Sequence, residues 1–468
     1  TVRLQALGFQ NSVAATQTLI DLMSGLSRRS RVMHQVLPLM LDWLSQSPDP
    51  DLGLAQLRLV LAHTPDHSLL VTLLQNNPVV GERLCTLLGT GKLIGDLMDR
   101  IPEFIPRLAD DSVLGHIRNR DDATTRLMQV LASRLERDAK VGTIRRFVRR
   151  RKLRIAARDV LGLAPPQATI EALSDSADAA VIGALDMITE YDDLFGVIAM
   201  GKWGGHELSY GSDIDLMYIH GARHKSRGIH LAVELGKVLS EPTRHGDAYN
   251  IDADLRPEGR RGPLSRSLAS YHRYYEEWMQ PWELLALVRA RPVAGSQELL
   301  EAYHEMIEPI LWQKSLPKEV VTEIRAIKAR VESERIPAGE DSDFHLKLGP
   351  GGLSDVEFLT QLLQLRHGGE NPSLRVTGTF EALDALRASG VLSASDYGAL
   401  HDSYLFCTRV RLRLHLQRGQ PSDSLPTDHD ASARLAVSLG FDRTGDLREQ
   451  YMRYTRRARR TFESLFYD

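Results

Sequence analysis

Apolar residues in the first third of the chain recur with the spacing of buried helices. The runs at 36–44 and 84–88 place leucines and other apolar side chains three and four positions apart. Breakers such as the Asn77-Pro78 pair separate these runs, and β-branched runs of period two are nearly absent. We therefore expect residues 1–165 to form an all-helical domain.

A basic segment lies near the end of this helical block. Its positive residues are Arg145, Arg146, Arg149, Arg150, Arg151, Lys152, Arg154 and Arg158. Charge runs of this kind usually form the solvated face of a helix. The opposite face would then bury Ile144, Phe147, Val148, Leu153 and Ile155. The alternative is a site for nucleotide phosphates or for the acidic surface of a partner.

The pattern changes near residue 195. An apolar run at 195–200, closed by glycine, predicts a buried strand, and the alternation at 213–219 predicts a second strand. Residues 229–240 have the spacing of a helix, and residues 248–255 are typical of a third strand. Strands and a helix within so short a stretch predict a small α/β unit.

After Pro263 the helical pattern returns and continues to the end of the chain. The fold class that we expect is α+β, predominantly α, with the small α/β unit between two helical domains. A linker-like stretch is expected at 337–343. The later helices are expected at 268–290, 324–331, 355–365, 380–386, 400–416 and 447–466. The predicted domains are 1–165, 166–300 and 301–468.

Charge and composition narrow the class of protein. The chain has 58 Lys plus Arg against 61 Asp plus Glu, a balance that argues against a nucleic-acid coat or a membrane-surface binder. No apolar run approaches the roughly 18 residues that span a bilayer. The two cysteines lie far apart and form no metal or disulfide framework, which suits a reducing cytoplasm. The first residue is Thr1, so we expect a processed start or a piece of something longer.

Residues 201–216 contain the candidate chemistry. Asp213 and Asp215 are two positions apart on a predicted strand, so their side chains share one face with Cβ atoms roughly 6.5–7 Å apart. Such hard oxygen ligands select Mg²⁺ or Mn²⁺, and without a metal the two charges would repel. The pair alone is a weak signal, because surface strands carry such pairs by chance.

Neighbouring residues strengthen this signal. A phosphate can approach the backbone closely at Gly204 and Gly205, where there is no Cβ. Downstream, Asp252, Asp254 and Arg256 alternate with apolar residues. A third carboxylate there would complete a metal site and could accept the proton of an attacking hydroxyl, while the arginine could meet a phosphate. The alternative is that these are exposed charges on a sheet edge.

The glycine pair, the Asp-x-Asp strand and the later aspartate resemble the nucleotidyltransferase superfamily of the polymerase-β type. One departure is that only residues 206–212 separate the glycine pair from Asp213, fewer than in many members. Four segments look more specifically like the glutamine synthetase adenylyltransferase family, and they stand in the right order. They are 201–216, 252–259, 282–292 and 347–358.

The resemblance implies transfer of AMP from ATP to a tyrosine hydroxyl of glutamine synthetase, with release of pyrophosphate. Full-length members carry an amino-terminal unit that removes AMP and a carboxy-terminal unit that adds it. This chain resembles the carboxy-terminal, adenylylating part behind a helical regulatory region, which would account for Thr1. The nearest alternative is the unit that removes AMP by phosphorolysis. Glutamine synthetase, and a PII-type signal protein as a regulator, are the implied partners in the cytoplasm, with no nucleic acid and no membrane.

The resemblance also implies roles for individual residues. Asp213 and Asp215 would bind Mg²⁺ or Mn²⁺, and the third catalytic and metal-binding carboxylate would be Asp252, with Asp254 left open as the alternative. Gly204, Gly205 and Ser212 would line the path of the ATP phosphates. Lys202 would be a phosphate or structural contact, and Arg256 a phosphate contact.

Other motif residues have local explanations. Ser354 and Glu357 have the spacing of a capping box at a helix start, although glycines before a helix can also form an anion site, and Lys347 is close. Packing is the expected role of Trp278, Trp282, Glu283, Arg289 and Arg291, and a structural role is expected for His206 and His220. Rival classes are a tRNA nucleotidyltransferase or template-free polymerase, which the charge balance disfavours, and a non-catalytic helical scaffold.

Overall fold

The computed structural model describes residues 2–467, except 24–27, 65–66, 191–193, 244–245, 335 and 337–340, and also excepting the side chains of 28–34, 67–69 and 71. The described chain is mostly helical and contains one small five-stranded sheet, so the predicted fold class is confirmed. The linker expected at 337–343 lies for the most part outside the described residues.

The chain divides into two compact units. The first comprises Thr1–Ile117, Arg149–Thr169 and Arg409–Gln450, and the second comprises Arg118–Val148, Ile170–Thr408 and Tyr451–Asp468. The helices α10 (Arg137–Val160), α11 (Pro166–Ile188), α20 (Ala394–Arg418) and α22 (Thr444–Tyr467) each contribute residues to both units. The division into three domains stays a prediction.

The first unit is helical throughout its described residues, as the apolar spacing predicts. Its elements α4 (Pro50–His63) and α6 (Pro78–Thr90) pack closely, because a Cβ on Gly53 would lie only 3.1 Å from the Gly89 α-carbon. The other elements are α1 (Val2–Ala6), α2 (Ser12–Met23), α3 (Arg28–Ser45), α5 (His67–Asn76), α7 (Lys92–Arg100), η1 (Pro102–Ala109), α8 (Asp111–Gly115) and α21 (His429–Ser438).

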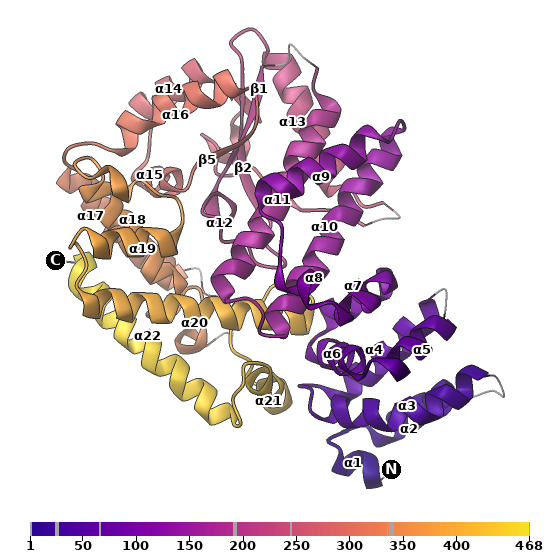
Figure 1. Ribbon diagram of the computed structural model, residues 1–468. Helices are drawn as coiled ribbons and strands as arrows, with labels where there is room; N and C mark the ends of the chain where they lie inside the picture. The colour runs from indigo at the N-terminus through magenta and orange to yellow at the C-terminus, as the bar shows by residue number, and fades with distance from the viewer. Residues whose placement is uncertain are drawn as a thin grey trace. The chain divides into compact units, whose positions relative to one another are not determined.

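The sheet belongs to the second unit (Figure 1). Its strand order is β3-β2-β1-β5, and β4 also pairs with β2. The strand β1 runs antiparallel to β2 and β5, whereas β2 runs parallel to β3 and β4. The strands are β1 (Phe195–Ala199), β2 (Ile214–His220), β3 (Ile251–Asp252), β4 (Ser265–Ser267) and β5 (Arg291–Gly295).

Two of the three predicted strands are confirmed as β1 and β2, and the helix predicted at 229–240 is confirmed within α13 (Lys225–Ser240). The strand predicted at 248–255 is wrong for most of its length, because β3 contains only Ile251 and Asp252. The amide of Asp254 donates to Asp252 Oδ1 at 2.7 Å, and this local turn ends the strand. The alternation of residues alone did not distinguish this turn from an extended strand.

Helices surround the sheet in the second unit. The helix α13 packs against β2 and β4, and α16 (Gln297–Leu311) packs against β1 and β5. The single helix predicted at 268–290 is instead two helices, because the chain bends before Pro281. The other later helices are confirmed within α17, α18, α19, α20 and α22. Bounds not yet given are α9 (Arg120–Ala132), α12 (Gly201–Gly204), α14 (Leu268–Glu277), α15 (Pro281–Val288), α17 (Lys318–Glu334), α18 (Leu353–His367) and α19 (Thr379–Ala388).

The basic segment forms part of α10. Its apolar positions are buried as expected at Ile144, Val148, Leu153 and Ile155. The expectation of a solvated basic face is wrong at Arg145, which is 1% exposed and donates to Thr243 Oγ1 at 2.6 Å and to the Val238 carbonyl at 3.1 Å. Buried backbone carbonyls need donors, and this guanidinium supplies them.

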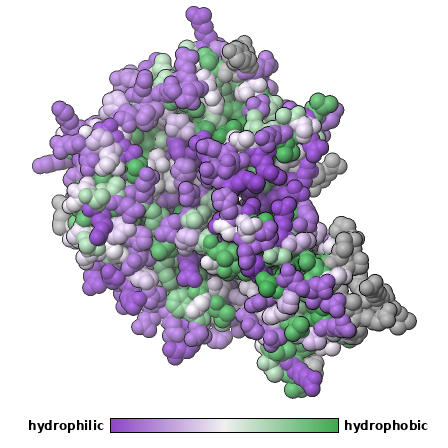
Figure 2. All heavy atoms as spheres, in the orientation of Figure 1, coloured by the Kyte–Doolittle hydropathy of each residue, from purple (hydrophilic) through white to green (hydrophobic). Residues whose placement is uncertain are grey.

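The surface is largely polar on the face that Figure 2 shows, with apolar residues scattered among charged ones. None of the described helices is long and apolar enough to cross a membrane.

Candidate active site

Asp215 and Asp252 are neighbours on adjacent parallel strands. They are register partners where β2 and β3 pair, and side chains at paired positions point to the same face of a sheet. Asp213 stands exposed just before β2. Burial, followed by the negative charges of Asp252 and Asp213, raises the pKa of Asp215 to about 7. Two of the predicted carboxylates, Asp252 and Asp213, therefore act on the third, Asp215.

The carboxylates of Asp213, Asp215 and Asp252 are the candidate ligands for a divalent cation. The part of the chain that the structure describes contains no group of three or more His, Cys, Asp or Glu residues already placed to hold a metal. The chemistry of the residues nevertheless fits: the half-buried Asp215 carboxylate is opposed by like charges, and hard oxygens are the ligands of Mg²⁺ and Mn²⁺.

The helix α12 begins directly beside Asp215. Gly201 has a φ of +54°, and a Cβ on it would lie 2.1 Å from Asp215 Oδ2. The amide of Met200 donates to the Asp215 carbonyl at 2.8 Å. The sequence patterns did not identify Gly201 as a site residue. Its distance from Asp213 along the chain was a usable signal, because residues 202–212 separate the two, a longer spacing than that between Gly205 and Asp213.

The predicted glycines lie at the other end of α12. A Cβ on Gly204 would lie 1.9 Å from the Arg289 carbonyl oxygen, so packing alone requires a glycine there. Gly205 ends the helix through its amide, which donates to the Gly201 carbonyl at 3.2 Å. Ser212 Oγ accepts from the Ser209 amide at 3.0 Å and closes the turn before β2.

Asp252 and Asp254, the two alternatives for the third carboxylate, have different surroundings. Asp252 is paired in register with Asp215, whereas the carboxylate of Asp254 forms an ion pair with Arg260 Nε at 2.6 Å. Arg256 is 8% exposed and donates to the Ala253 carbonyl at 2.6 Å, so its guanidinium also supports this loop. These contacts favour Asp252 over Asp254 as the third carboxylate.

Lys202 belongs to a buried charge cluster. Its ammonium bonds Tyr404 Oη at 2.6 Å and forms ion pairs with Glu357 and, at 3.3 Å, with Glu207. Arg289 Nη1 lies 3.2 Å from Glu207 Oε2. The buried charge cluster comprises Lys202, Glu207, Arg289, Glu357, Thr379 and Tyr404.

The positive charges of Lys202 and Arg289 compensate the negative charges of Glu207 and Glu357 in this cluster. Burial alone would raise the pKa of both glutamates, but the neighbouring charges of Lys202 and Arg289 outweigh it. The pKa of Glu207 is therefore lowered, and that of Glu357 is lowered to about 2. The cluster joins α12 and the loop after it to α18, α19 and α20, which carry Glu357, Thr379 and Tyr404.

A second buried network holds Trp203. Its indole donates to Asp178 Oδ1 at 2.8 Å, and Arg291 binds both oxygens of the same carboxylate at 2.7 and 2.9 Å. Asp178 has a completely buried side chain on α11. Sequence reasoning missed this residue, because it lies in an apolar helix without a motif of its own.

The helix start predicted at Ser354 is wrong in detail. The N-cap of α18 is Gly352 and makes no side-chain capping bond, whereas Glu357 turns to Lys202 instead. Asp355 fixes the start of the helix by accepting from the Gly351 amide at 2.7 Å. The capping box does not form, because the ammonium of Lys202 offers the Glu357 carboxylate a charged and therefore stronger partner.

The remaining expectations are mixed. Burial is confirmed for Glu283 and Arg289, whereas Trp278 and Trp282 are 55% and 38% exposed. The ring of Trp278 nevertheless packs against Tyr274, with ring centroids 6.3 Å apart. His220 is buried and its Nδ1 lies 2.8 Å from Ser265 Oγ, a structural contact as expected. Burial lowers the pKa of His206 to about 4, which keeps this residue neutral.

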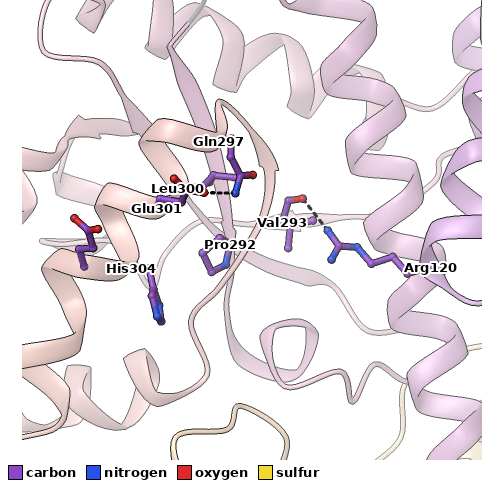
Figure 3. A pocket seen from close by; sticks show the side chains of 8 residues that line it. Arg120, Pro292, Val293, Gln297, Leu300, Glu301 and His304 are labelled. Carbon is purple, nitrogen blue, oxygen red and sulfur yellow. Dashed lines mark hydrogen bonds between the residues drawn. The ribbon is translucent and has the colours of Figure 1, made fainter.

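A pocket of about 420 Å³ lies elsewhere in the second unit, beside β5 (Figure 3). Arg120 closes one side and donates to the Val293 carbonyl at 3.0 Å, while α16 supplies the opposite side. None of the predicted site residues lines this pocket. It is lined by Arg120, Pro292, Val293, Gln297, Leu300, Glu301, His304 and Glu305.

Comparison with known families gives two matches. A family model described as glutamate-ammonia ligase adenylyltransferase matches residues 81–306, and one described as GlnD PII-uridylyltransferase matches residues 325–467. The first match contains the carboxylates, α12 and all five strands of the sheet. The second contains α18, α19 and Tyr404.

Whole-chain similarity agrees with the first match. A bifunctional glutamine synthetase adenylyltransferase/adenylyl-removing enzyme of Streptomyces coelicolor is 40% identical, over 99% of this chain and 49% of its own length. The protein of the same name from Cutibacterium acnes is 37% identical, over 100% of this chain and 48% of its own length. The chain thus spans about half the length of the curated relatives it matches. It belongs to the glutamate-ammonia ligase adenylyltransferase family of nucleotidyltransferases.

Proposed function

We propose that this chain transfers AMP from ATP to a tyrosine hydroxyl of glutamine synthetase. In this reaction the tyrosine oxygen bonds to the α-phosphorus, the bond from that phosphorus to the β-phosphate bridge breaks, and pyrophosphate leaves. The observation that carries the proposal is the in-register pair Asp215 and Asp252, set in a chain that matches this family. A PII-type signal protein as a regulator and a cytoplasmic location belong to the same proposal.

The three carboxylates have distinct tasks in this proposal. Asp213, Asp215 and Asp252 would hold Mg²⁺ or Mn²⁺, which when bound supplies positive charge for the triphosphate. Asp252, beside Asp215 in the sheet, accepts the proton of the attacking hydroxyl. The raised pKa of Asp215 supports this arrangement, because it marks a carboxylate whose charge is not compensated by the protein alone.

Residues around α12 position the nucleotide. The backbone at Gly201 and the turn ending at Ser212 border the acidic pair, and we propose that they line the phosphate path together with Gly204 and Gly205. Lys202 has its ammonium engaged by Glu357 and Tyr404, which supports a role in holding α12 in place. Arg256 orders the loop that follows Asp252.

The carboxy-terminal helices contribute to the same chemistry. Residues 325–467 match a uridylyltransferase family model, although residues 81–306 match an adenylyltransferase model. ATP and UTP differ in the base and share the triphosphate. We therefore assign these helices to the triphosphate and to the placement of α12, and base recognition to other parts of the chain.

Removal of AMP by phosphorolysis is the second candidate, because the curated relatives are named for both activities and this chain spans half of their length. Two incubations separate the candidates. With unmodified glutamine synthetase, Mg²⁺ and α-labelled ATP, an adenylylating chain places label on the synthetase. With adenylylated synthetase and inorganic phosphate, a removing chain releases ADP. Label transfer without ADP release supports our proposal, and ADP release without label transfer overturns it.

A further inference from the structure

The loop before α18 presents Lys347 from a fixed backbone. The amide of Lys347 donates to His345 Nδ1 at 3.2 Å, and its carbonyl accepts from the Ser354 amide at 2.8 Å. His345 itself is only 3% exposed. Both backbone groups of this lysine are therefore held, although its side chain is exposed to solvent.

The same loop is held a second time at Gly351, where its backbone lies close to α22. Gly351 has a φ of +72°, and a Cβ on it would lie 1.8 Å from the Thr455 carbonyl oxygen of α22. Its amide is bonded by Asp355, which in turn pairs with the fully buried Lys328 at 2.6 Å. Such close backbone contact leaves the loop little freedom to move.

This loop is tied to the candidate active site. The helix α18 that follows it carries Glu357, which pairs with Lys202 of α12, and α12 begins with Gly201 against Asp215. The positive charge of Lys347 contributes to the lowered pKa of Glu357 and opposes the raised pKa of Asp215. Lys347 is therefore a cation placed near the acidic pair by a rigid support.

The ammonium of Lys347 has no direct bonding partner among the described residues. It makes no ion pair or hydrogen bond with any residue that the structure describes. Arg289, whose charge also acts on Asp215, is 5% exposed and belongs to the buried charge cluster. Of these two cations, Lys347 is the one whose charge can meet a ligand that arrives from solvent.

We infer that Lys347 is a nucleotide-binding residue whose ammonium contacts the β- and γ-phosphates of ATP. This inference rests on the proposed function, because it takes ATP as the nucleotide. A lysine binds phosphate as a point charge, and the negative charge that grows on departing pyrophosphate increases its effect. AMP lacks these phosphates, so its binding should not depend on Lys347.

Calorimetric titration of the full chain tests the inference without the protein substrate. The titrants are ATP and AMP, each with Mg²⁺, and the proteins are wild type, Lys347→Met, Lys347→Arg and Lys318→Met. Lys318 is an exposed lysine on α17 and serves as the matched control. Loss of a charged phosphate contact should weaken ATP binding about 10- to 100-fold in Lys347→Met. Lys347→Arg should recover most of this loss, and Lys318→Met should bind as wild type does.

The outcomes separate two failures. If wild type binds ATP and Lys347→Met binds it equally well, or loses ATP and AMP binding by the same factor, the inference is wrong and the proposed function stands. If wild type binds no ATP, the proposed function fails and this inference fails with it. A selective loss of ATP binding in Lys347→Met, restored by arginine, supports both.

Discussion

The carboxylate of Asp215 lies against the backbone of Gly201, so closely that a Cβ on residue 201 would stand 2.1 Å from Oδ2. The glycine also has a φ of +54°, which L side chains rarely adopt. Residue 201 is thus constrained both by its own backbone and by the acidic residue that we place in the chemistry.

Gly201→Ala should therefore impair the site more than the fold. The added methyl group displaces the Asp215 carboxylate, so we expect at least about 100-fold slower transfer, comparable to misplacing a catalytic group. The loss of stability should be about 1 kcal/mol, from the left-handed backbone alone. Gly390→Ala is the control, because Gly390 has a φ of +78° and nothing lies within 4 Å of its Cβ position. Equal activity of the two variants in the transfer assay would contradict this account.

Asp215→Asn should stabilise the metal-free protein at neutral and alkaline pH. Burial and the neighbouring carboxylates raise the pKa of Asp215 to about 7 from an ordinary 3.8, so the folded state holds the proton more tightly than the unfolded state. Between these two pH values the stability of wild type falls as pH rises, and above about pH 7 the full cost is present. The asparagine variant has no such titration.

We expect Asp215→Asn to be more stable than wild type by about 1–3 kcal/mol at pH 8 in a chelating buffer, with the gap closing toward pH 4. Thermal melts at a series of pH values measure this difference. Added Mg²⁺ should stabilise wild type and leave the variant unchanged, because a ligand stabilises only the state that binds it. A gap that widens as pH falls would show that Asp215 is not opposed by like charges.

Tyr404→Phe should weaken the buried charge cluster. The hydroxyl lies 2.6 Å from Glu207 Oε2 and 2.6 Å from Lys202 Nζ, and its removal leaves buried charges less well bonded. We expect a loss of about 1–3 kcal/mol in the free energy of unfolding, measured by urea titration. Tyr397→Phe, which removes a hydroxyl bonded at 2.7 Å to exposed Asp384, should cost less than about 1 kcal/mol. An equal loss of unfolding free energy in both variants would mean that the buried charge cluster contributes no more to stability than an exposed hydrogen bond does.

Sequence patterns predicted the parts of the site that are local. The short apolar run of β1 and the alternation over 213–219 predicted two strands correctly and placed Asp215 on the second, although β1 and β2 are buried at nearly every position. These patterns could not show that β3 ends at Asp252 after only two residues. The strand ends there because the Asp254 amide donates a hydrogen bond to the side chain of Asp252, which closes a turn.

Long-range charge pairs could not be predicted from the sequence. Glu357 matches a capping pattern but pairs with Lys202, a residue far away in the chain. Asp178 looks like an ordinary polar position of a helix, yet it is completely buried and bonds both Trp203 and Arg291. Such contacts depend on which helices the fold brings together, and a motif reports only its own neighbourhood.

The central claim is that the acidic pair on β2 and β3 carries out nucleotidyl transfer. Its most direct test is the transfer of label from α-labelled ATP to purified glutamine synthetase, with Mg²⁺, by wild type and by Asp215→Asn of confirmed fold. We predict labelled synthetase with wild type and at least about 100-fold less with the variant, since the carboxylate that would hold the metal is gone. Transfer by Asp215→Asn at the wild-type rate would contradict the account.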